Sequence, residues 1–136
     1  MDNFRKDIIS FEDIKLLVDK FYEKVNKDDL LSWIFNNLSK VDWKTHLPIM
    51  YDFWCTILLG TKTYKGHPFD IHLYLPVDSR HFDRWVKLFE EAVDENFSGE
   101  IAKEAKLRAN TISEIFQYKI KIIKDNESKV GLYNNI

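Results

Sequence analysis

The stretch "GTKTYKGHPFDIHLYLP", residues 60–76, places a histidine inside a short apolar run bounded by chain-breaking residues. Gly60, Gly66 and Pro68 precede His72 and Pro76 follows it, so a regular helix has little room here. Such a histidine can be a buried side chain satisfied by its neighbours. It can also be a metal ligand on a segment too short to form a full helix. The residues on either side bear on that choice.

The rest of the chain has helical spacing. No segment alternates convincingly between apolar and polar residues, as a half-buried strand would. Apolar positions instead recur at steps of three and four in residues 11–25, 43–58, 82–97 and 101–123, and "LLSWIFNN" at 30–37 adds a short helix or turn of helix. We therefore predict an all-α domain over residues 1–124, with about four long and two short helices, followed by a polar, frayed tail at 125–136.

Pro48 bears on where the helix over 43–58 begins. Proline has no N–H and is best tolerated in a first helical turn, which favours Thr45 as the N-cap over Asp42. Gly60 supplies the C-terminal stop. After the segment that contains His72, Ser79 is the expected cap of the next helix.

Composition narrows the class of protein. The chain has 136 residues and a net charge of −2, so it lacks the basic footprint of nucleic-acid binding. Cys55 is alone, which excludes an intrachain disulfide and agrees with a reducing compartment. The N-terminus has no secretory apolar region, and the longest apolar stretch, residues 47–60, is too short to span a bilayer. We expect a cytoplasmic protein without membrane or nucleic-acid partners.

This chain lacks the residues that most kinds of catalytic or metal site need. Cys55 lies on a helix without a glycine-rich turn or an adjacent histidine, so it makes a poor nucleophile. The four histidines, His46, His67, His72 and His81, are separated by 21, 5 and 9 positions and do not match zinc spacing. A haem iron needs only one protein imidazole, because the porphyrin supplies four nitrogens.

The chain also has the parts that a haem cleft needs, which are apolar walls and a few polar groups. On the helix over 43–58, His46 and Met50 share a face, with Phe53 and Trp54 one turn further along. Tyr22 and Trp85 lie on apolar helical faces and carry donors that need partners when buried. Taken singly, Tyr22 and Trp85 in such positions are more often ordinary core residues, and a histidine placed like His46 is more often a surface or capping residue. Composition and spacing leave both interpretations open.

Five segments in register resemble the truncated haemoglobins, and within them the group III class found in bacteria. They occur in the order and with the separations of that family and cover residues about 11 to 123: "FYEKV" at 21–25, "IFNN" at 34–37, "HLPIMYDFW" at 46–54, "LLGTKTYKGHPFDIHLYLP" at 58–76 and "HFDRWVKLFEEAVDENFSG" at 81–99. The paired-glycine motifs of groups I and II are absent, which fits group III.

The resemblance implies a globin-like two-over-two sandwich of helices around a non-covalently bound haem b. It also implies a role for each matching residue. His72 corresponds to the proximal iron ligand, on a proximal helix reduced to about one turn. Tyr22, His46 and Trp85 correspond to the distal residues that face a bound ligand. The positions around the ring are Phe35, Met50, Phe53, Trp54 and Phe82, and Arg80 and Arg84 are possible propionate partners by position alone.

The function implied by the resemblance is reversible binding of O2, NO or CO at ferrous iron. A donor from Tyr22 or Trp85 would stabilise bound O2 and slow its release. An alternative is an enzyme that carries out NO dioxygenation or peroxidase-like chemistry with an external reductase as electron donor. A third possibility is a helical regulatory module that has lost the haem, against which the retention of His72 and the distal residues argues.

Overall fold

The computed structural model describes the backbone of residues 5–64, 66 and 76–134, and side chains as far as residue 126. Every regular element in these ranges is a helix. The elements are α1 (Phe11–Lys27), α2 (Asp29–Ser32), the π-helix η1 (Trp33–Leu38), α3 (Trp43–Leu59), α5 (Ser79–Asn96) and α6 (Glu100–Asn134). The described part of the chain therefore confirms the prediction of an all-α fold with four long helices and two short ones.

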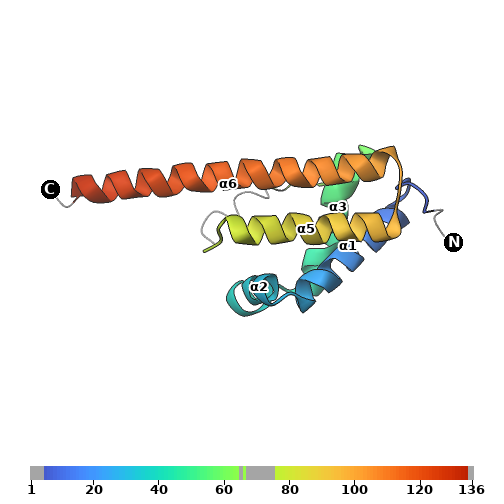
Figure 1. Cartoon of the computed structure of the whole chain (residues 1–136), viewed down its shortest axis with the longest axis horizontal. Coiled ribbons are helices and arrows are strands. Elements are labelled where there is room, and N and C mark those ends of the chain that lie inside the picture. The colour runs from blue at the N-terminus through green and yellow to red at the C-terminus, as the bar shows by residue number, and fades with distance from the viewer. Residues whose placement is uncertain (1–4, 65, 67–75, 135–136) are drawn as a thin grey trace.

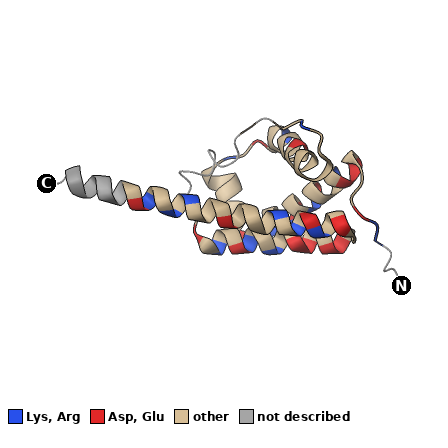
Figure 2. Ribbon diagram, turned by 90° about the horizontal axis from the view of Figure 1, so that it is seen from above, with Lys and Arg blue, Asp and Glu red and all other residues tan. Residues whose placement is uncertain are grey.

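The long helices form two layers (Figure 1). Helices α5 and α6 lie side by side and run in opposite directions, while α1 and α3 cross them as a second pair. The view from above shows the same pairing, with acidic and basic residues interleaved along α5 and α6 (Figure 2). None of the described helices is both long and apolar enough to cross a membrane. The arrangement is a two-over-two helical sandwich.

Two of the predicted helix starts are wrong by a few residues. The N-cap of α3 is Asp42 and not Thr45: the Asp42 carboxylate accepts the Lys44 N–H at 3.2 Å, and the Thr45 hydroxyl donates to the same carboxylate at 3.0 Å. The N-cap of α5 is Asp78 and not Ser79, because the Asp78 carboxylate accepts the backbone N–H of Arg80 at 2.9 Å. In both places an aspartate just upstream of the predicted residue caps the helix.

Residues outside the helices hold the start of α6. Asp7 in the N-terminal segment accepts hydrogen bonds from the backbone N–H groups of Ile101 and Ala102, at 2.9 and 2.8 Å. Gly99, at φ 142°, allows this approach, since a Cβ there would lie 2.4 Å from Asp7 Cγ. Asp7 therefore acts as the N-terminal cap of a helix that begins more than ninety residues later in the chain.

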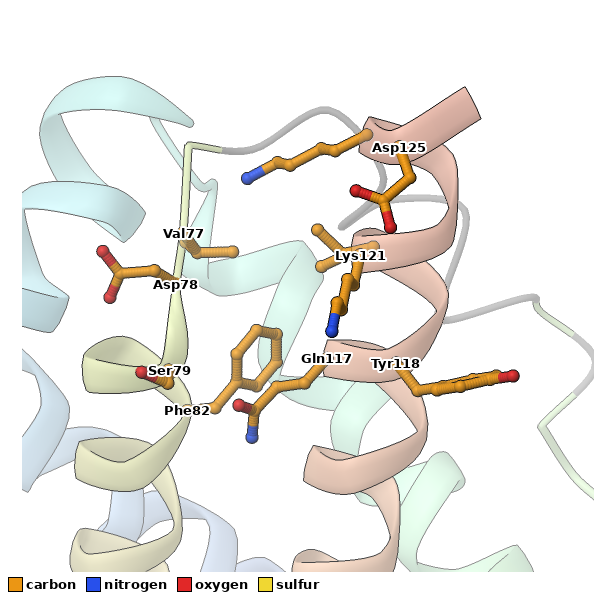
Figure 3. Close-up of a pocket in the computed structure, with 10 residues that line it drawn as sticks. Val77, Asp78, Ser79, Phe82, Gln117, Tyr118, Lys121 and Asp125 are labelled. Atoms are coloured by element: carbon orange, nitrogen blue, oxygen red, sulfur yellow. The ribbon is translucent and has the colours of Figure 1, made fainter. Parts of the chain in front are cut away.

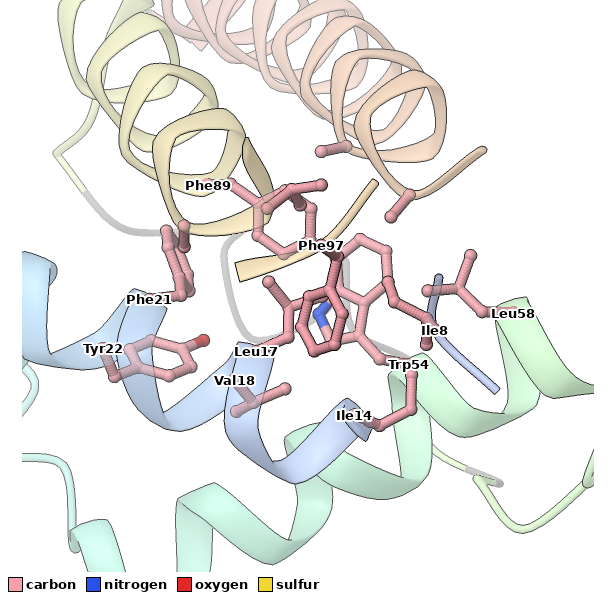
Figure 4. Close-up of a cluster of buried hydrophobic side chains, with 14 of the residues drawn as sticks. Ile8, Ile14, Leu17, Val18, Phe21, Tyr22, Trp54, Leu58, Phe89 and Phe97 are labelled. Carbon is pink, nitrogen blue, oxygen red and sulfur yellow. The ribbon is translucent and has the colours of Figure 1, made fainter. Parts of the chain in front are cut away.

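The main core lies where α1 and α3 cross α5 and α6 (Figure 4). Trp54 of α3 stacks on Phe89 of α5, with ring centroids 4.6 Å apart and an interplanar angle of 19°. Three alanines of α6 pack onto this region, and their small side chains let α6 approach the aromatic layer closely. The fully buried members include Ile14, Leu17, Val18, Phe21, Trp54, Phe89, Val93, Ala102, Ala105 and Ala109.

Helix α6 is longer than the periodic pattern indicates. The last apolar position of the predicted helix is Ile123, whereas the backbone stays helical to Asn134. The segment 125–134, expected to be a frayed tail, therefore continues the helix beyond its contacts with α5, as Figure 1 shows. The division of the chain into a domain at 1–124 and a tail at 125–136 stays a prediction.

Candidate functional site

The crossing of α1 and α3 brings Tyr22 and His46 together. Tyr22 faces inward from the middle of α1, and His46 lies in the first turns of α3. The Tyr22 hydroxyl is 3.4 Å from His46 Nε2, and the two rings are 5.4 Å apart and nearly perpendicular. Tyr22 is 6% exposed, and this burial raises the pKa of its phenol, which therefore stays protonated and able to donate.

Two further aromatic rings complete this site. Phe35 of η1 and Trp43 at the start of α3 stack on each other at 5.7 Å, and both contact Tyr22 and His46. All pairwise centroid distances among the four rings lie between 5.2 and 6.1 Å. We call Tyr22, Phe35, Trp43 and His46 the distal cluster. It combines a phenol, an imidazole and two largely apolar rings.

Trp43 is a member of this site that the sequence analysis treats only as an apolar helix position. The step of three from Trp43 to His46 puts both side chains on one face of α3, and this spacing is the signal in the sequence. Its indole N–H donates to Asn36 Oδ1 at 2.8 Å, and Asn36 Nδ2 donates to Asn26 Oδ1, also at 2.8 Å. These hydrogen bonds join η1 to the end of α1 and the beginning of α3.

Trp85, the third predicted distal residue, lies one ring away from the cluster. Its indole stacks on Phe89 at 5.9 Å and contacts the Phe21 ring edge-on at 5.6 Å. Phe21 in turn contacts Tyr22 at 4.7 Å. The structure therefore brings Tyr22 and His46 into direct contact, and it links Trp85 to Tyr22 through their shared neighbour Phe21.

The residues of α3 that are predicted to contact the haem lie in two different environments. Met50 and Phe53 are half-buried and lie on the same side of α3 as His46, and Phe53 contacts Tyr64 edge-on at 5.2 Å. Trp54 is 2% exposed and belongs to the main core. The side of α3 that continues from His46 is thus apolar but incompletely covered by the described residues.

Phe82 lies beside a groove of about 500 Å³ between the start of α5 and the later turns of α6 (Figure 3). Its buried neighbours Val77 and Ile120 give the groove an apolar floor, and Ile34 of η1 belongs to the same buried cluster. The rim is polar, with the remaining lining residues being Asp78, Ser79, Gln117, Tyr118, Lys121, Lys124 and Asp125. Through Ile34, Phe82 is connected to the element that carries Phe35.

Both arginines considered as propionate partners already have carboxylate partners. Arg80 pairs with Asp78, with Nη2 and Oδ2 3.0 Å apart, and hydrogen bonds from Arg80 lower the pKa of the Asp78 carboxyl. Arg84 pairs with Asp28, whose side chain also caps α2 by accepting the Leu31 N–H at 3.0 Å. His72, the predicted iron ligand, lies outside the described residues, and its role stays a prediction.

Comparison with known proteins agrees with this fold. The model of the bacterial-like globin family matches residues 7–116. The chain is 39% identical over 115 residues to the group 3 truncated hemoglobin ctb of Campylobacter jejuni, covering 82% of this chain and 91% of that one. The crystal structure of the group III truncated hemoglobin from Campylobacter jejuni superposes with a TM-score of 0.77 at 37% identity, covering 86% of this chain and 95% of the other.

The family match covers all the helices that form the distal cluster and the main core, from the start of α1 to the middle of α6. The structural match covers nearly the whole of the solved protein, so the two-over-two arrangement is shared as well as the sequence pattern. The resemblance expected from five short segments is therefore confirmed. This chain belongs to the bacterial-like globins and, within them, to the group III truncated haemoglobins.

Proposed function

We propose that this globin binds haem b without a covalent link and reversibly binds O2, NO and CO at its iron. Membership of the globin family implies haem binding. The observation that carries the proposal further is the contact between the buried Tyr22 hydroxyl and His46 Nε2, at 3.4 Å. It supports a polar ligand site in a region where most neighbouring side chains are apolar.

The described residues fit a flat apolar cofactor with a polar ligand site beside it. Met50 and Phe53 offer a half-buried apolar surface on the His46 side of α3, and Phe35 offers a half-buried ring on η1. Phe82 adds the apolar floor of the groove between α5 and α6. With Trp54 behind this surface, these residues would hold the haem, and His72 would supply the imidazole for its iron. When bound, the haem supplies an iron with one coordination position open to a diatomic molecule.

Tyr22 is the residue best suited to stabilise such a molecule. Its phenol is buried and protonated, so it can donate to a ligand that has gained partial negative charge. A hydrogen bond of this charge-assisted kind is worth about 1.5–3 kcal/mol, or about ten- to a hundredfold in the rate of ligand release. We infer that O2 leaves slowly, which favours scavenging, sensing or redox chemistry over delivery.

His46 and Trp85 have different relations to this donor. His46 Nε2 is within reach of the Tyr22 hydroxyl and can accept its proton in a hydrogen bond when no ligand is present, if the imidazole proton is on Nδ1. Trp85 contacts Phe21 and stacks on Phe89, so it is linked to Tyr22 through Phe21. We therefore infer that Tyr22 is the first donor and Trp85 the second.

The test of haem binding is the optical spectrum of the purified protein after haem is supplied. We expect a Soret band that shifts when CO is added to the reduced protein. His72→Ala should lose most of the haem affinity, whereas the matched variant His67→Ala in the same segment should keep it. No Soret band after haem supplementation would contradict the proposal, and equal affinity in both variants would contradict the assignment of His72.

The enzymatic alternative is separated from binding by a second measurement. In NO dioxygenation, the haem would supply the iron at which NO and O2 combine to give nitrate, and an added electron donor would return that iron to the ferrous state. Rapid oxidation by NO together with repeated re-reduction by an added electron donor would support this activity, as would fast peroxide-driven oxidation of a substrate. Failure of both would leave ligand binding as the function.

A further inference from the structure

The four rings of the distal cluster differ in their exposure to solvent. Tyr22 is 6% exposed, whereas the rings that contact it from η1 and α3, Phe35, Trp43 and His46, are half-buried. These three rings therefore cover Tyr22 on the side of η1 and α3. Since each of the four rings contacts the other three, a small molecule approaching from that side reaches Tyr22 only after one of the outer rings has moved.

Among the outer rings, Trp43 is held by a series of hydrogen bonds that we call the asparagine bridge. It consists of Trp43 Nε1–H donating to Asn36 Oδ1 and Asn36 Nδ2 donating to Asn26 Oδ1, each at 2.8 Å. Each member lies close in sequence to a ring of the cluster. Asn26 is four residues after Tyr22, Asn36 directly follows Phe35, and Trp43 is three residues before His46.

The asparagine bridge is weak because Asn26 and Asn36 are exposed, so water competes for both hydrogen bonds and the net stabilisation from each is small. Its middle member, Asn36, lies on η1, a π-helix, and such turns are rare overall and frequently lie at functional sites. The contacts that hold Trp43 against Tyr22 can therefore break without disturbing the main core.

The first turn of α3 is itself loosely joined to the rest of that helix. Pro48 lies inside α3, beyond the first turn, and has no N–H to donate to the carbonyl of Lys44. The proline ring also crowds that carbonyl. The turn that carries Trp43 and His46 therefore lacks one of the hydrogen bonds that would fix it to the following turns. A movement of Trp43 meets less resistance here than in an uninterrupted helix.

We propose that Trp43 is the outer wall of the ligand site and controls access to Tyr22, and that Asn36 is the positioning residue that keeps Trp43 closed. The ligands concerned are small uncharged diatomic molecules. This inference rests on the proposed function, because it concerns the path by which those ligands reach the site. It assigns roles to Trp43, Asn36 and Asn26 in addition to those of Tyr22, His46 and Trp85.

The first test follows the indole N–H of Trp43 by ¹⁵N NMR in the haem-free protein, with the signal assigned from Trp43→Phe. In the wild type the bond to Asn36 protects this proton from exchange with water. We expect Asn36→Ala to speed its exchange about two- to tenfold, the range that loss of one exposed hydrogen bond gives. Asn37→Ala, on the same π-helix and also exposed, is the matched control and should leave the exchange rate unchanged.

The second test measures CO association after flash photolysis of the haem-loaded protein. If Trp43 is closed most of the time, the association rate follows the fraction of open molecules, so Asn36→Ala should raise it about two- to tenfold. Trp43→Phe keeps a ring but removes the donor and should raise the rate similarly. The double variant should show no further increase, because both substitutions remove the same hydrogen bond.

The outcomes separate this inference from the proposed function. A protein that takes up no haem would refute the proposed function and, with it, control of ligand access. A protein that takes up haem and CO, but with equal CO rates in wild type and Asn36→Ala, would refute the role of Trp43 alone. Unchanged indole exchange in Asn36→Ala would show that the asparagine bridge does not hold the ring.

Discussion

The distal cluster and the aromatic core next to it are built from similar residues, yet they differ in what surrounds them. The core stack, which we define as Phe21, Trp54, Trp85 and Phe89, has three members that are at most 2% exposed. In the distal cluster only Tyr22 is buried. Ring contact distances are alike in the two groups, so packing geometry alone does not distinguish a stabilising cluster from a ligand site.

What distinguishes them is the placement of polar atoms. The distal cluster contains a phenol hydroxyl and an imidazole in contact, and its indole N–H is bonded to an exposed asparagine. The core stack buries an aromatic layer between α3 and α5, where burial contributes stability in proportion to the area removed from water. The two clusters meet at the neighbouring residues Phe21 and Tyr22, 4.7 Å apart. We infer that one supports the fold and the other carries the chemistry.

The largest effect should come from opening the core stack. Trp54→Ala removes a buried indole from its place against Phe89, and we expect the free energy of unfolding of the haem-free protein to fall by about 3–5 kcal/mol. Urea denaturation followed by circular dichroism measures it. Trp33→Ala, at a position that is 50% exposed, should change stability by about 0.5 kcal/mol or less. Similar losses of unfolding free energy in the two variants would contradict the conclusion that the core stack supports the fold.

Removing the polar atom of the distal cluster should change ligand kinetics instead. Tyr22→Phe keeps the ring contacts and loses the donor, so we expect haem binding to persist and O2 release to accelerate about ten- to a hundredfold. Stopped-flow displacement of O2 by CO measures the rate. Tyr51→Phe is the matched control, since the Tyr51 hydroxyl donates to Asp19 and not to the distal cluster. An unchanged rate of O2 release in Tyr22→Phe would contradict the assignment of Tyr22 as a donor to the bound ligand.

The smallest effect should come from the cap of α6, which touches neither cluster. Burial would raise the pKa of Asp7, but backbone hydrogen bonds from Ile101, Ile8 and Ala102 outweigh it and lower that pKa. The charged carboxylate therefore adds stability that is fully present above about pH 4 and is lost as pH falls through the lowered pKa. Asp7→Asn should cost about 1 kcal/mol at pH 7 and less below pH 3.

Urea titrations of wild type and Asp7→Asn at pH 7 and pH 3 would measure this difference. The CO association rate of Asp7→Asn should equal that of the wild type at pH 7, because the substitution leaves Trp43 and Tyr22 in place. An equal stability difference at both pH values would mean that the charge of Asp7 does not contribute. A changed CO association rate would mean that the cap of α6 and the distal cluster are coupled.

The sequence predicts the helices well because helical periodicity is a local property of the chain. The starts of α3 and α5 are harder to predict, because more than one neighbouring residue can cap each helix. At α3 the preference of Pro48 for a first turn is overridden, since beginning the helix at Trp43 allows that ring to contact Phe35 and Tyr22. At α5 two adjacent acceptors, Asp78 and Ser79, both suit the cap, and the choice depends on the conformation of the preceding backbone.

The candidate site could be predicted only in part. Tyr22 and His46 are both expected on inward faces, and the fold then determines that α1 and α3 cross where these side chains meet. The contact between Trp43 and Asn36 depends on the path of the chain between η1 and α3, which has no periodic signal. The contacts of Phe21 with both Tyr22 and Trp85 likewise depend on how this one ring is oriented in the assembled protein.

The cap that Asp7 gives to α6 has a consequence for how the molecule is made. Asp7 leaves the ribosome more than ninety residues before Ile101 and Ala102, from whose N–H groups its carboxylate accepts hydrogen bonds. The segment that carries Asp7 therefore has no partner until the start of α6 has been translated. In the meantime α1 can form and pack against α3, and the contact between Asp7 and α6 is made only after both have formed.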